Sequence, residues 1–148
     1  FKKAYTYHYT AMTADIVDQA KAMQEDWCTW RECSSDIELA HENEAIARVL
    51  SDWDVLSGVI GGCILINGRA VAYTVGERLT PEMMVIHFEK GSADYKGVYQ
   101  AINQMFLSHE AAGIKWVNRE QDIGDEGLRK AKLSYHPLRF LKKYRVNF

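Results

Sequence analysis

The dipeptide Asn67-Gly68 lies between two runs rich in strand-forming residues, and it constrains the fold more than any other local feature. The runs read GVIGGCILI before the dipeptide and RAVAYTVGE after it. Asn-Gly favours the type I′ turn, because both central residues of that turn need a positive φ angle. The sequence therefore predicts a β-hairpin over residues 58–77. Gly61 and Gly62 predict a bulge in it, or a place where another backbone segment packs closely.

The segment before the hairpin predicts a short strand and two helices. Residues 5–10, YTYHYT, alternate in the manner of a strand. Apolar residues recur at helical spacing from about residue 14 to residue 30. In the next segment Ser35 is followed three residues later by Glu38. This spacing predicts a capping box at the start of the second helix, in which each side chain bonds a backbone amide.

The segment after the hairpin predicts a strand, a helix and a second strand. Residues 83–89 and 114–118 are short apolar runs, and residues 97–112 have helical periodicity between them. A β-α-β unit of this kind makes its two strands parallel neighbours. A further helix is predicted over about 125–135, and a last strand over 144–148.

The order of these elements predicts an α+β fold with three layers, in which helices flank both faces of a mixed sheet. At 148 residues the chain is long enough for one domain with a sizeable core, so residues 1–148 are predicted to form a single domain. The same order of elements is found in the GNAT acyltransferase fold, and other α+β folds share parts of it.

Composition excludes some classes of protein. No apolar run reaches the roughly 18 residues of a membrane span, and the first residues contain no apolar core of a signal peptide. The chain has three cysteines, Cys28, Cys33 and Cys63, and none has CxxC or zinc-ligand spacing. We therefore expect buried thiols in a reducing cytoplasm, and no metal site.

Charge is distributed unevenly along the chain. Residues 13–54 contain eleven acidic residues against three basic ones, whereas residues 127–148 contain seven basic residues and no acidic one. A basic end predicts an anionic partner. The alternative is that the two segments neutralise each other in the folded protein, and the sequence leaves both possibilities open.

Two long motifs carry a specific resemblance. HFEKGSADYKGVYQAINQMF at 87–106 and NREQDIGDEGLRKAKLSYHP at 118–137 resemble the phosphatidylglycerol lysyltransferase C-terminal domain family, over roughly residues 55–146. Proteins of this family are bacterial and are built from GNAT-like domains, often two in tandem. The resemblance implies that this chain is a fragment of a longer two-domain protein, namely its C-terminal half, with an N-terminal GNAT domain as its partner.

The resemblance also implies a reaction. Relatives transfer an acyl or aminoacyl group to an amine or a lipid hydroxyl, and some take that group from charged tRNA. The expected function is therefore (amino)acyl transfer from a tRNA or CoA donor to a small-molecule or peptide acceptor, by a soluble cytoplasmic member of the family. Two alternatives stay open: an acetyl-CoA-dependent N-acetyltransferase, and a non-catalytic half that binds a ligand or acts as a scaffold.

Candidate site residues follow the two parallel strands, because the carboxyl ends of such strands border a ligand crevice. Acyl transfer to an amine needs a base, donors for the oxyanion and an acid for the leaving group. Glu89 or Glu120 is predicted as the base, Asn118 as a donor and Tyr135 as the acid, a role that a tyrosine in that region has in many GNAT enzymes. The full set of predicted substrate-binding residues is His87, Lys90, Asp94, Tyr95, Lys96, Asn118, Arg119, Asp122, Arg129 and Lys132.

Alternation places His87 and Glu89 on one face of their strand. The polar residues after the second strand also have a purely structural interpretation, in which Glu120 and Asp122 pair with Arg119 or Arg129 and hold the loop.

The segment before the helix at 97–112 bears on the donor. Acyl-CoA enzymes of the GNAT fold usually carry a Q/R-x-x-G-x-G/A loop there, whose amides point at the pyrophosphate. Here the sequence reads EKGSADYKGVY, which does not match, although Lys90 and Lys96 offer positive charge to a phosphate. The sequence thus leaves aminoacyl-tRNA and acyl-CoA as candidate donors. The tRNA acceptor end is also a candidate partner for the basic C-terminal segment, whose alternative is a solvated face.

Overall fold

The computed structural model describes residues 1–144 and 146. The chain divides into two compact units, Phe1–Asn118 and Arg119–Phe148, and each is described by itself. The first unit contains the sheet and three α-helices, and the described part of the second contains one short helix.

The first unit is built on a mixed sheet with the strand order β1-β2-β3-β4-β5. Neighbouring strands are antiparallel except β4 and β5, which are parallel. The strands are β1 (His8–Ala11), β2 (Val59–Ile66), β3 (Arg69–Thr80), β4 (Met83–Gly91) and β5 (Trp116–Asn118). The predicted mixed sheet and its parallel pair are confirmed.

The turn between β2 and β3 has the predicted conformation, since Asn67 has a φ of 52° and Gly68 a φ of 77°. The register shift in this hairpin falls between Ile64 and Leu65, however, and not at the two glycines. A Cβ atom on Gly61 would lie 2.8 Å from the ring of Trp53, and one on Gly62 would lie 2.2 Å from the hydroxyl of Tyr9. These glycines therefore make room for side chains, where the sequence predicted a bulge or a close backbone.

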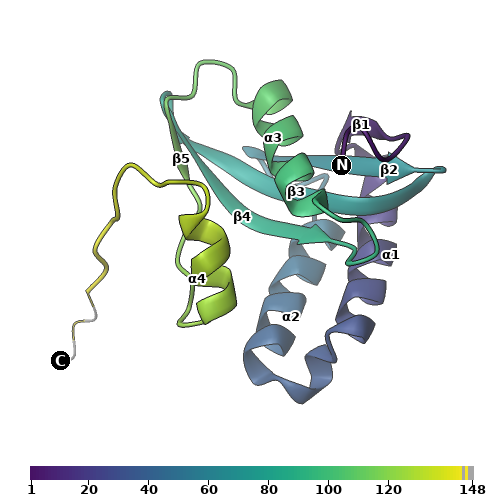
Figure 1. Ribbon diagram of the computed structural model, residues 1–148, viewed down its shortest axis with the longest axis horizontal. Coiled ribbons are helices and arrows are strands. Elements are labelled where there is room, and N and C mark those ends of the chain that lie inside the picture. Colours follow the sequence, from purple (N-terminus) through teal and green to yellow (C-terminus); the bar gives the residue numbers. More distant parts are fainter. Residues whose placement is uncertain (145, 147–148) are drawn as a thin grey trace. The chain divides into compact units, whose positions relative to one another are not determined.

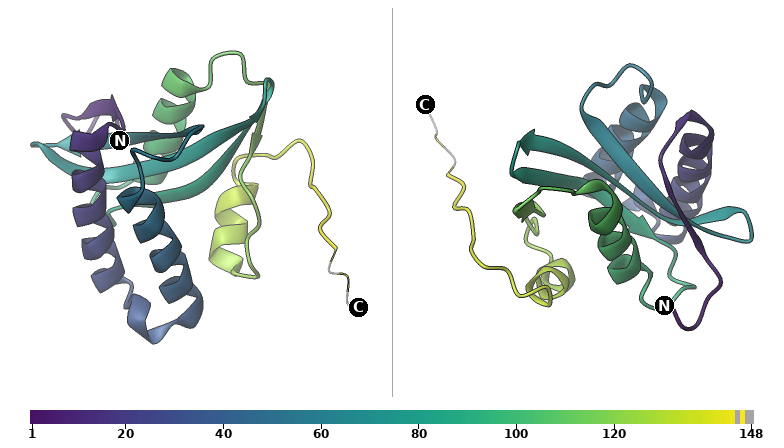
Figure 2. Two further views of the ribbon diagram at one scale, coloured as in Figure 1. Left: turned by 180° about the vertical axis from the view of Figure 1, so that it is seen from behind. Right: turned by 90° about the horizontal axis from the view of Figure 1, so that it is seen from above.

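Helices cover both faces of the sheet, as predicted (Figures 1 and 2). α1 (Ala14–Trp30) and α2 (Ile37–Ser51) pack on one face, where their apolar residues form a core with Cys63, Tyr73 and Val75. α3 (Val98–Glu110) packs on the other face, against Ile64 and Ala72 among others. The alternation of residues along β2 and β3 divides these two cores.

The start of α2 differs from the prediction. Asp36 is its N-cap, and the Asp36 carboxylate accepts hydrogen bonds from the amides of Glu38 (2.9 Å) and Leu39 (3.2 Å). The hydroxyl of Ser35 donates instead to the carbonyl of Glu32 in the preceding turn. The predicted capping box is therefore wrong by one residue, because an aspartate directly before the helix offers the same oxygen acceptor.

Two of the cysteines form a disulfide, which the sequence did not predict. Cys28 in the last turn of α1 is bonded to Cys33, with their Cα atoms 5.1 Å apart. The chain turns back after α1 because Glu32 adopts a left-handed conformation with a φ of 52°. The expectation of three thiols is wrong for this pair, whereas Cys63 is a buried free thiol. The free thiols were the argument for a reducing cytoplasm, and the disulfide removes it for this pair. The cytoplasmic location therefore stays a prediction.

The second unit contains α4 (Glu126–Leu133), whose N-cap Asp125 accepts a hydrogen bond from the amide of Leu128 at 2.6 Å. His136 has a φ of 52° and precedes Pro137, where the sequence predicted the end of the helix. The strand predicted at 144–148 lies mostly outside the described residues. In the described part of the chain, no helix combines the length and the apolar composition that a membrane span requires.

Candidate functional site

β4 and β5 pair over a short distance only. Their register joins Met83 to Trp116, Met84 to Val117 and Val85 to Asn118, and there β5 ends. β4 continues beyond this point to Gly91. The continuing part of β4 contains His87, Glu89 and Lys90, all three of which the sequence predicted as site residues.

His87 lies at an irregularity of β4. The register with β3 shifts there, since Val75 pairs with Phe88 while Gly76 pairs with Ile86. The extra residue is His87, and its Nε2 lies 3.1 Å from Oε2 of Glu77 in β3. Both side chains are partly accessible, with 31% of the imidazole and 40% of the carboxylate side chain exposed.

Glu89 and Lys90 are held on opposite faces of the sheet. The Glu89 carboxylate accepts a hydrogen bond from Nδ2 of Asn103 in α3 (3.1 Å). Lys90 points to the α1 and α2 face, where its ammonium contacts the Glu42 carboxylate at 2.7 Å. Because of the bulge, His87 meets Glu77 on that second face, so the predicted common face of His87 and Glu89 does not form.

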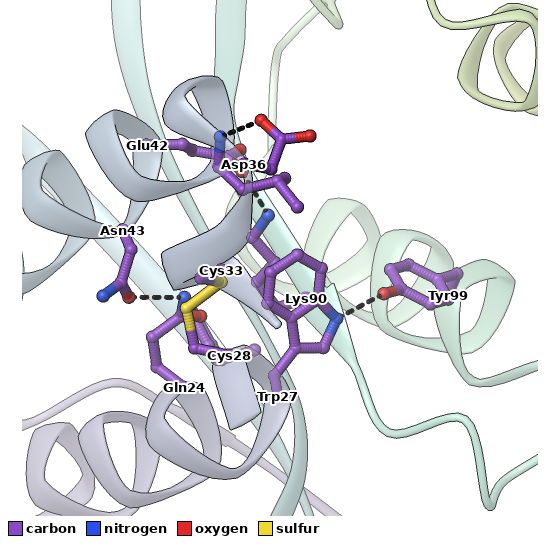
Figure 3. Close-up of polar contacts among 11 residues, drawn as sticks. Gln24, Trp27, Cys28, Cys33, Asp36, Glu42, Asn43, Lys90 and Tyr99 are labelled. Atoms are coloured by element: carbon purple, nitrogen blue, oxygen red, sulfur yellow. Dashed lines mark hydrogen bonds and ion pairs between the residues drawn. A yellow bond between two sulfur atoms is a disulfide. The ribbon is translucent and has the colours of Figure 1, made fainter. Parts of the chain in front are cut away.

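Lys90 is the most buried charged residue of the strand, with 8% of its side chain exposed. Its ammonium lies 3.9 Å from the centre of the Trp27 ring, and Figure 3 shows it between that ring and Glu42. Burial lowers the pKa of Lys90, and the nearby Glu42 carboxylate opposes this shift. The sequence predicted that Lys90 binds a phosphate, whereas here Lys90 connects β4 to α2.

Buried hydrogen bonds surround this ion pair. The indole of Trp27 donates to the hydroxyl of Tyr99 in α3 (3.1 Å), and Gln24 donates to Asn43 in α2 (3.0 Å). The Tyr73 hydroxyl donates to the Gln24 side chain at 2.5 Å. Figure 3 shows the Cys28–Cys33 disulfide beside these contacts. The network fixes α1 and α2 against the end of β4.

The loop between β4 and α3 contains three predicted binding residues. Asp94 is exposed, and its carboxylate accepts a hydrogen bond from the hydroxyl of Ser92 at 3.3 Å. Tyr95 packs edge-on against Tyr5, with ring centres 5.2 Å apart. The side chain of Lys96 is exposed, while its amide donates to the hydroxyl of Tyr5 (3.3 Å).

The second unit gathers four other predicted residues. The guanidinium of Arg119 lies 4.2 Å from the centre of the Tyr135 ring. The ammonium of Lys132 donates to the carbonyls of Arg119 and Gln121, each at 2.6 Å. Glu120, between those two carbonyls, is exposed and has a φ of 55°. Lys132 and Tyr135 therefore order the segment that follows β5.

Asp122 pairs with Arg129, which is the structural interpretation that the sequence had left open. The Arg129 Nε lies 2.5 Å from Oδ2 of Asp122, and the amide of Gly124 donates to the same carboxylate at 3.1 Å. The hydrogen bond from Arg129, followed by that from Gly124, lowers the pKa of Asp122 to about 2.

The structure thus forms two groups of predicted residues, one along β4 and one in the second unit. Sequence reasoning missed the partners that hold the first group, which are Glu77, Asn103, Glu42 and Trp27. A charged residue such as Glu77 at the end of an apolar strand is a visible signal. Its pairing with His87 depends on the register and on the bulge, which the sequence pattern does not specify.

Two open hollows of the first unit lie away from these residues. One of about 220 Å³ is lined by His41, Glu44, Ala45 and Arg48 of α2. One of about 470 Å³ lies along α3, and its lining residues are Phe1, Lys2, Lys3, Gly97, Gln100, Ala101 and Gln104. Among residues 1–144 and 146, no three His, Cys, Asp or Glu side chains are placed to hold a metal ion.

Comparison with known sequences identifies a family. The sequence model of the family described as "Phosphatidylglycerol lysyltransferase, C-terminal" matches residues 1–147. No curated protein matches the sequence. A conserved protein of unknown function from Bacteroides thetaiotaomicron has 34% identity to the chain and a TM-score of 0.87. The match covers 93% of this chain and 47% of that protein, so this chain spans about half of its relative's length.

Comparison with other solved structures identifies the fold. A ribosomal-protein-alanine N-acetyltransferase from Brucella melitensis has a TM-score of 0.67 at 11% identity, and the match covers 97% of this chain and 99% of that one. An aminoglycoside N-acetyltransferase in complex with CoA has a TM-score of 0.62 at 8% identity, with 97% and 93% covered. The predicted GNAT-like α+β fold is confirmed.

Proposed function

We propose that this chain, which belongs to the phosphatidylglycerol lysyltransferase C-terminal family, transfers an acyl or aminoacyl group from a tRNA or CoA donor to an amine or hydroxyl acceptor. Its fold is of the acyltransferase type.

The observation that carries the proposal is the early end of β5 beside a longer β4. Past the pair of Val85 and Asn118, β4 presents partly exposed polar side chains, whereas the residues just before it in the strand are buried. The end of a parallel pair in an open sheet is where ligands of α/β proteins bind. His87 and Glu89 offer groups there that accept and donate protons.

The loop before α3 supports aminoacyl-tRNA as the donor in preference to acetyl-CoA. A pyrophosphate site of the usual kind needs loop amides that point at the ligand. Here the amides of Asp94, Tyr95 and Lys96 donate to Ser92 Oγ, the Ser92 carbonyl and the Tyr5 hydroxyl. The amides of Ser92 and Val98 also donate to carbonyls of the chain. Five amides of this loop therefore already donate to groups of the protein.

The second unit supplies positive charge suited to a tRNA acceptor end. Arg139, Lys142 and Lys143 are exposed, and basic side chains bind phosphates with an affinity that falls as salt rises. In the proposed reaction, Tyr135 protonates the leaving group. Glu89 and Glu120 bind the ammonium group of the acceptor. An N-terminal GNAT domain of a longer chain is the proposed partner, and the relative of about twice this length supports it.

A transfer assay tests the proposal. The protein is incubated with [14C]lysyl-tRNA or with [14C]acetyl-CoA, together with an amine-bearing peptide or with phosphatidylglycerol vesicles. We expect label to move from lysyl-tRNA to an acceptor, at a rate that falls as salt rises from 50 to 200 mM. Transfer from acetyl-CoA alone would support the alternative N-acetyltransferase, for which the CoA complex of the structural neighbour is the favourable observation.

The absence of transfer from both donors would contradict the proposal and favour the non-catalytic half. The observation that supports this alternative is that the chain matches only 47% of the Bacteroides relative. The same assay on a longer protein that carries two such domains would then decide whether the second domain supplies the activity.

A further inference from the structure

Glu77 and His87 form a carboxylate–imidazole pair across β3 and β4. The Oε2 of Glu77 lies 3.1 Å from the Nε2 of His87. With the ring proton on Nε2 and donated to Glu77, the basic lone pair lies on Nδ1. A carboxylate in this position fixes the tautomer and stabilises the imidazolium that forms when the ring accepts a proton.

The pair lies at an irregularity of the sheet. His87 is the extra residue of the β4 bulge, two residues after Val85, which is the last residue of β4 paired with β5. Bulges are over-represented next to active sites, where they redirect a side chain. Both members also stay accessible, at 31% and 40%, although Val75 and Gly76 beside them in β3 are buried.

The other charged groups of β4 are committed to different contacts. Glu89 is bonded to Asn103 on the α3 face, and Lys90 is buried against Glu42 and Trp27. On the face of α1 and α2, the Glu77 carboxylate contacts His87, and Phe88 comes between His87 and Lys90 along the strand. Among the ionisable residues of β4, His87 best combines accessibility with an orienting partner.

We propose that His87 is the general base of the acyl transfer and that Glu77 is its positioning residue, an inference that rests on the proposed function. His87 takes the N–H or O–H proton of the acceptor while the acceptor atom bonds to the carbonyl carbon of the donor. The bond from that carbon to the tRNA oxygen or CoA sulfur breaks. The leaving group takes its proton from Tyr135. His87 then loses its proton and Tyr135 regains one through the solvent, so that both groups end as they began.

The test is the pH dependence of kcat/KM for lysyl transfer from [14C]lysyl-tRNA, or for acetyl transfer if acetyl-CoA is the donor used. We expect His87→Gln to lower kcat/KM by about 100-fold or more and to remove the acid limb of the profile. Glu77→Gln is expected to lower kcat/KM by about 10-fold and to move the acid limb to lower pH, because a neutral amide no longer stabilises the imidazolium.

Matched controls separate this role from a structural one. His41→Gln removes an imidazole from α2, and Glu82→Gln removes a carboxylate that pairs with Lys115 at the surface. Both variants should retain the wild-type rate and profile. If His87→Gln fails to fold, the shift of the acid limb in Glu77→Gln decides, because a stabilising contact alone leaves that limb in place.

The outcomes are distinct. Wild-type transfer with an unchanged acid limb in His87→Gln and Glu77→Gln overturns the assignment of the base and leaves the proposed function standing. No transfer by the wild type from either donor overturns the proposed function, and the catalytic role of His87 with it.

Discussion

The indole of Trp27 in α1 donates a hydrogen bond to the hydroxyl of Tyr99 in α3, at 3.1 Å. The two helices pack on opposite faces of the sheet, so this bond connects the faces at the end of β4 (Figure 3). The ammonium of Lys90 lies over the face of the same indole, 3.9 Å from the ring centre. One side chain thus joins three elements that are distant in sequence.

Tyr99→Phe tests this connection. The substitution removes the acceptor of a buried indole N–H, which we expect to lower the free energy of unfolding by about 1 kcal/mol. It should also move the Nε1–H resonance of Trp27 in an NMR spectrum. Tyr144→Phe is the control, because Tyr144 is 81% exposed. Equal stability of both variants and an unmoved resonance would show that the bond is weak in solution.

A double-mutant cycle tests the ion pair of Lys90 and Glu42. Glu42→Ala leaves a buried ammonium without its carboxylate, and we expect a loss of about 2 kcal/mol, less than for a fully buried pair because the Glu42 side chain is 38% exposed. In the Lys90→Met background the same substitution should cost under about 0.5 kcal/mol. Glu44→Ala, which removes the partner of Arg48 at the surface, is the control. Additive losses would rule out coupling.

Reduction of the Cys28–Cys33 disulfide should destabilise the first unit. The bond closes a short loop, with a sequence separation of 5, for which chain entropy predicts about 2 kcal/mol. Urea unfolding with and without a thiol reductant measures this difference. The Cys28→Ala/Cys33→Ala variant should be insensitive to the reductant, and Cys63→Ala should respond as the wild type does. A wild type that is equally stable in both conditions would contradict the prediction.

The buried thiol of Cys63 predicts a loss of stability at alkaline pH. Burial raises the pKa of Cys63 from 9.0 to about 12, so the unfolded state loses this proton at a lower pH than the folded state. The free energy of unfolding therefore falls as pH rises from about 9 toward 12, by about 1.4 kcal/mol between pH 8 and pH 10 from this group.

Tyr9 and Tyr73 also lower the free energy of unfolding at alkaline pH, because burial raises the pKa of each. The contribution of Cys63 is therefore measured as the difference between the wild type and a variant. Cys63→Ala should have a shallower dependence on pH than the wild type by that amount. The same comparison in a Cys28→Ala/Cys33→Ala background excludes thiol–disulfide exchange. Parallel curves for the two proteins would contradict the prediction.

The structure has Asp36 as the N-cap of α2, whereas the sequence pattern predicted Ser35. Asp36→Ala removes the acceptor for the amides of Glu38 and Leu39, and we expect a loss of about 1 kcal/mol. Ser35→Ala should cost less, because its hydroxyl bonds the carbonyl of Glu32 outside the helix. Thermal unfolding of the two variants gives the comparison. A larger loss in Ser35→Ala would restore the predicted capping box.

Local patterns predicted most of the fold. The Asn67-Gly68 turn, the helix at Ala14–Trp30 and the parallel arrangement of β4 and β5 follow from residue preferences and spacing within short windows. The disulfide was missed because its geometry depends on the left-handed Glu32, and the helical spacing up to about residue 30 gives no sign of that turn. Spacing alone does not specify such a reversal of the chain.

The candidate site was predicted less well, for a physical reason. Which face a strand residue occupies depends on every bulge before it, and the bulge at His87 separates this residue from Glu89. The sequence offered Lys90 as a positive charge for a phosphate, yet its environment is set by Trp27 and Glu42 from distant helices. The roles predicted for Glu89, Glu120 and Tyr135 stay predictions.

The glycine at position 62 makes the first strand depend on the end of α3. Tyr9 lies over Gly62, stacks on His109 with ring centres 4.6 Å apart, and donates to Glu110, 101 residues further along the chain. Any side chain at position 62 would push this ring out of its place. Because Gly62 has no Cβ atom, Tyr9 of β1 can pack against the end of α3. Replacing Gly62 to strengthen β2 would therefore weaken the packing of β1.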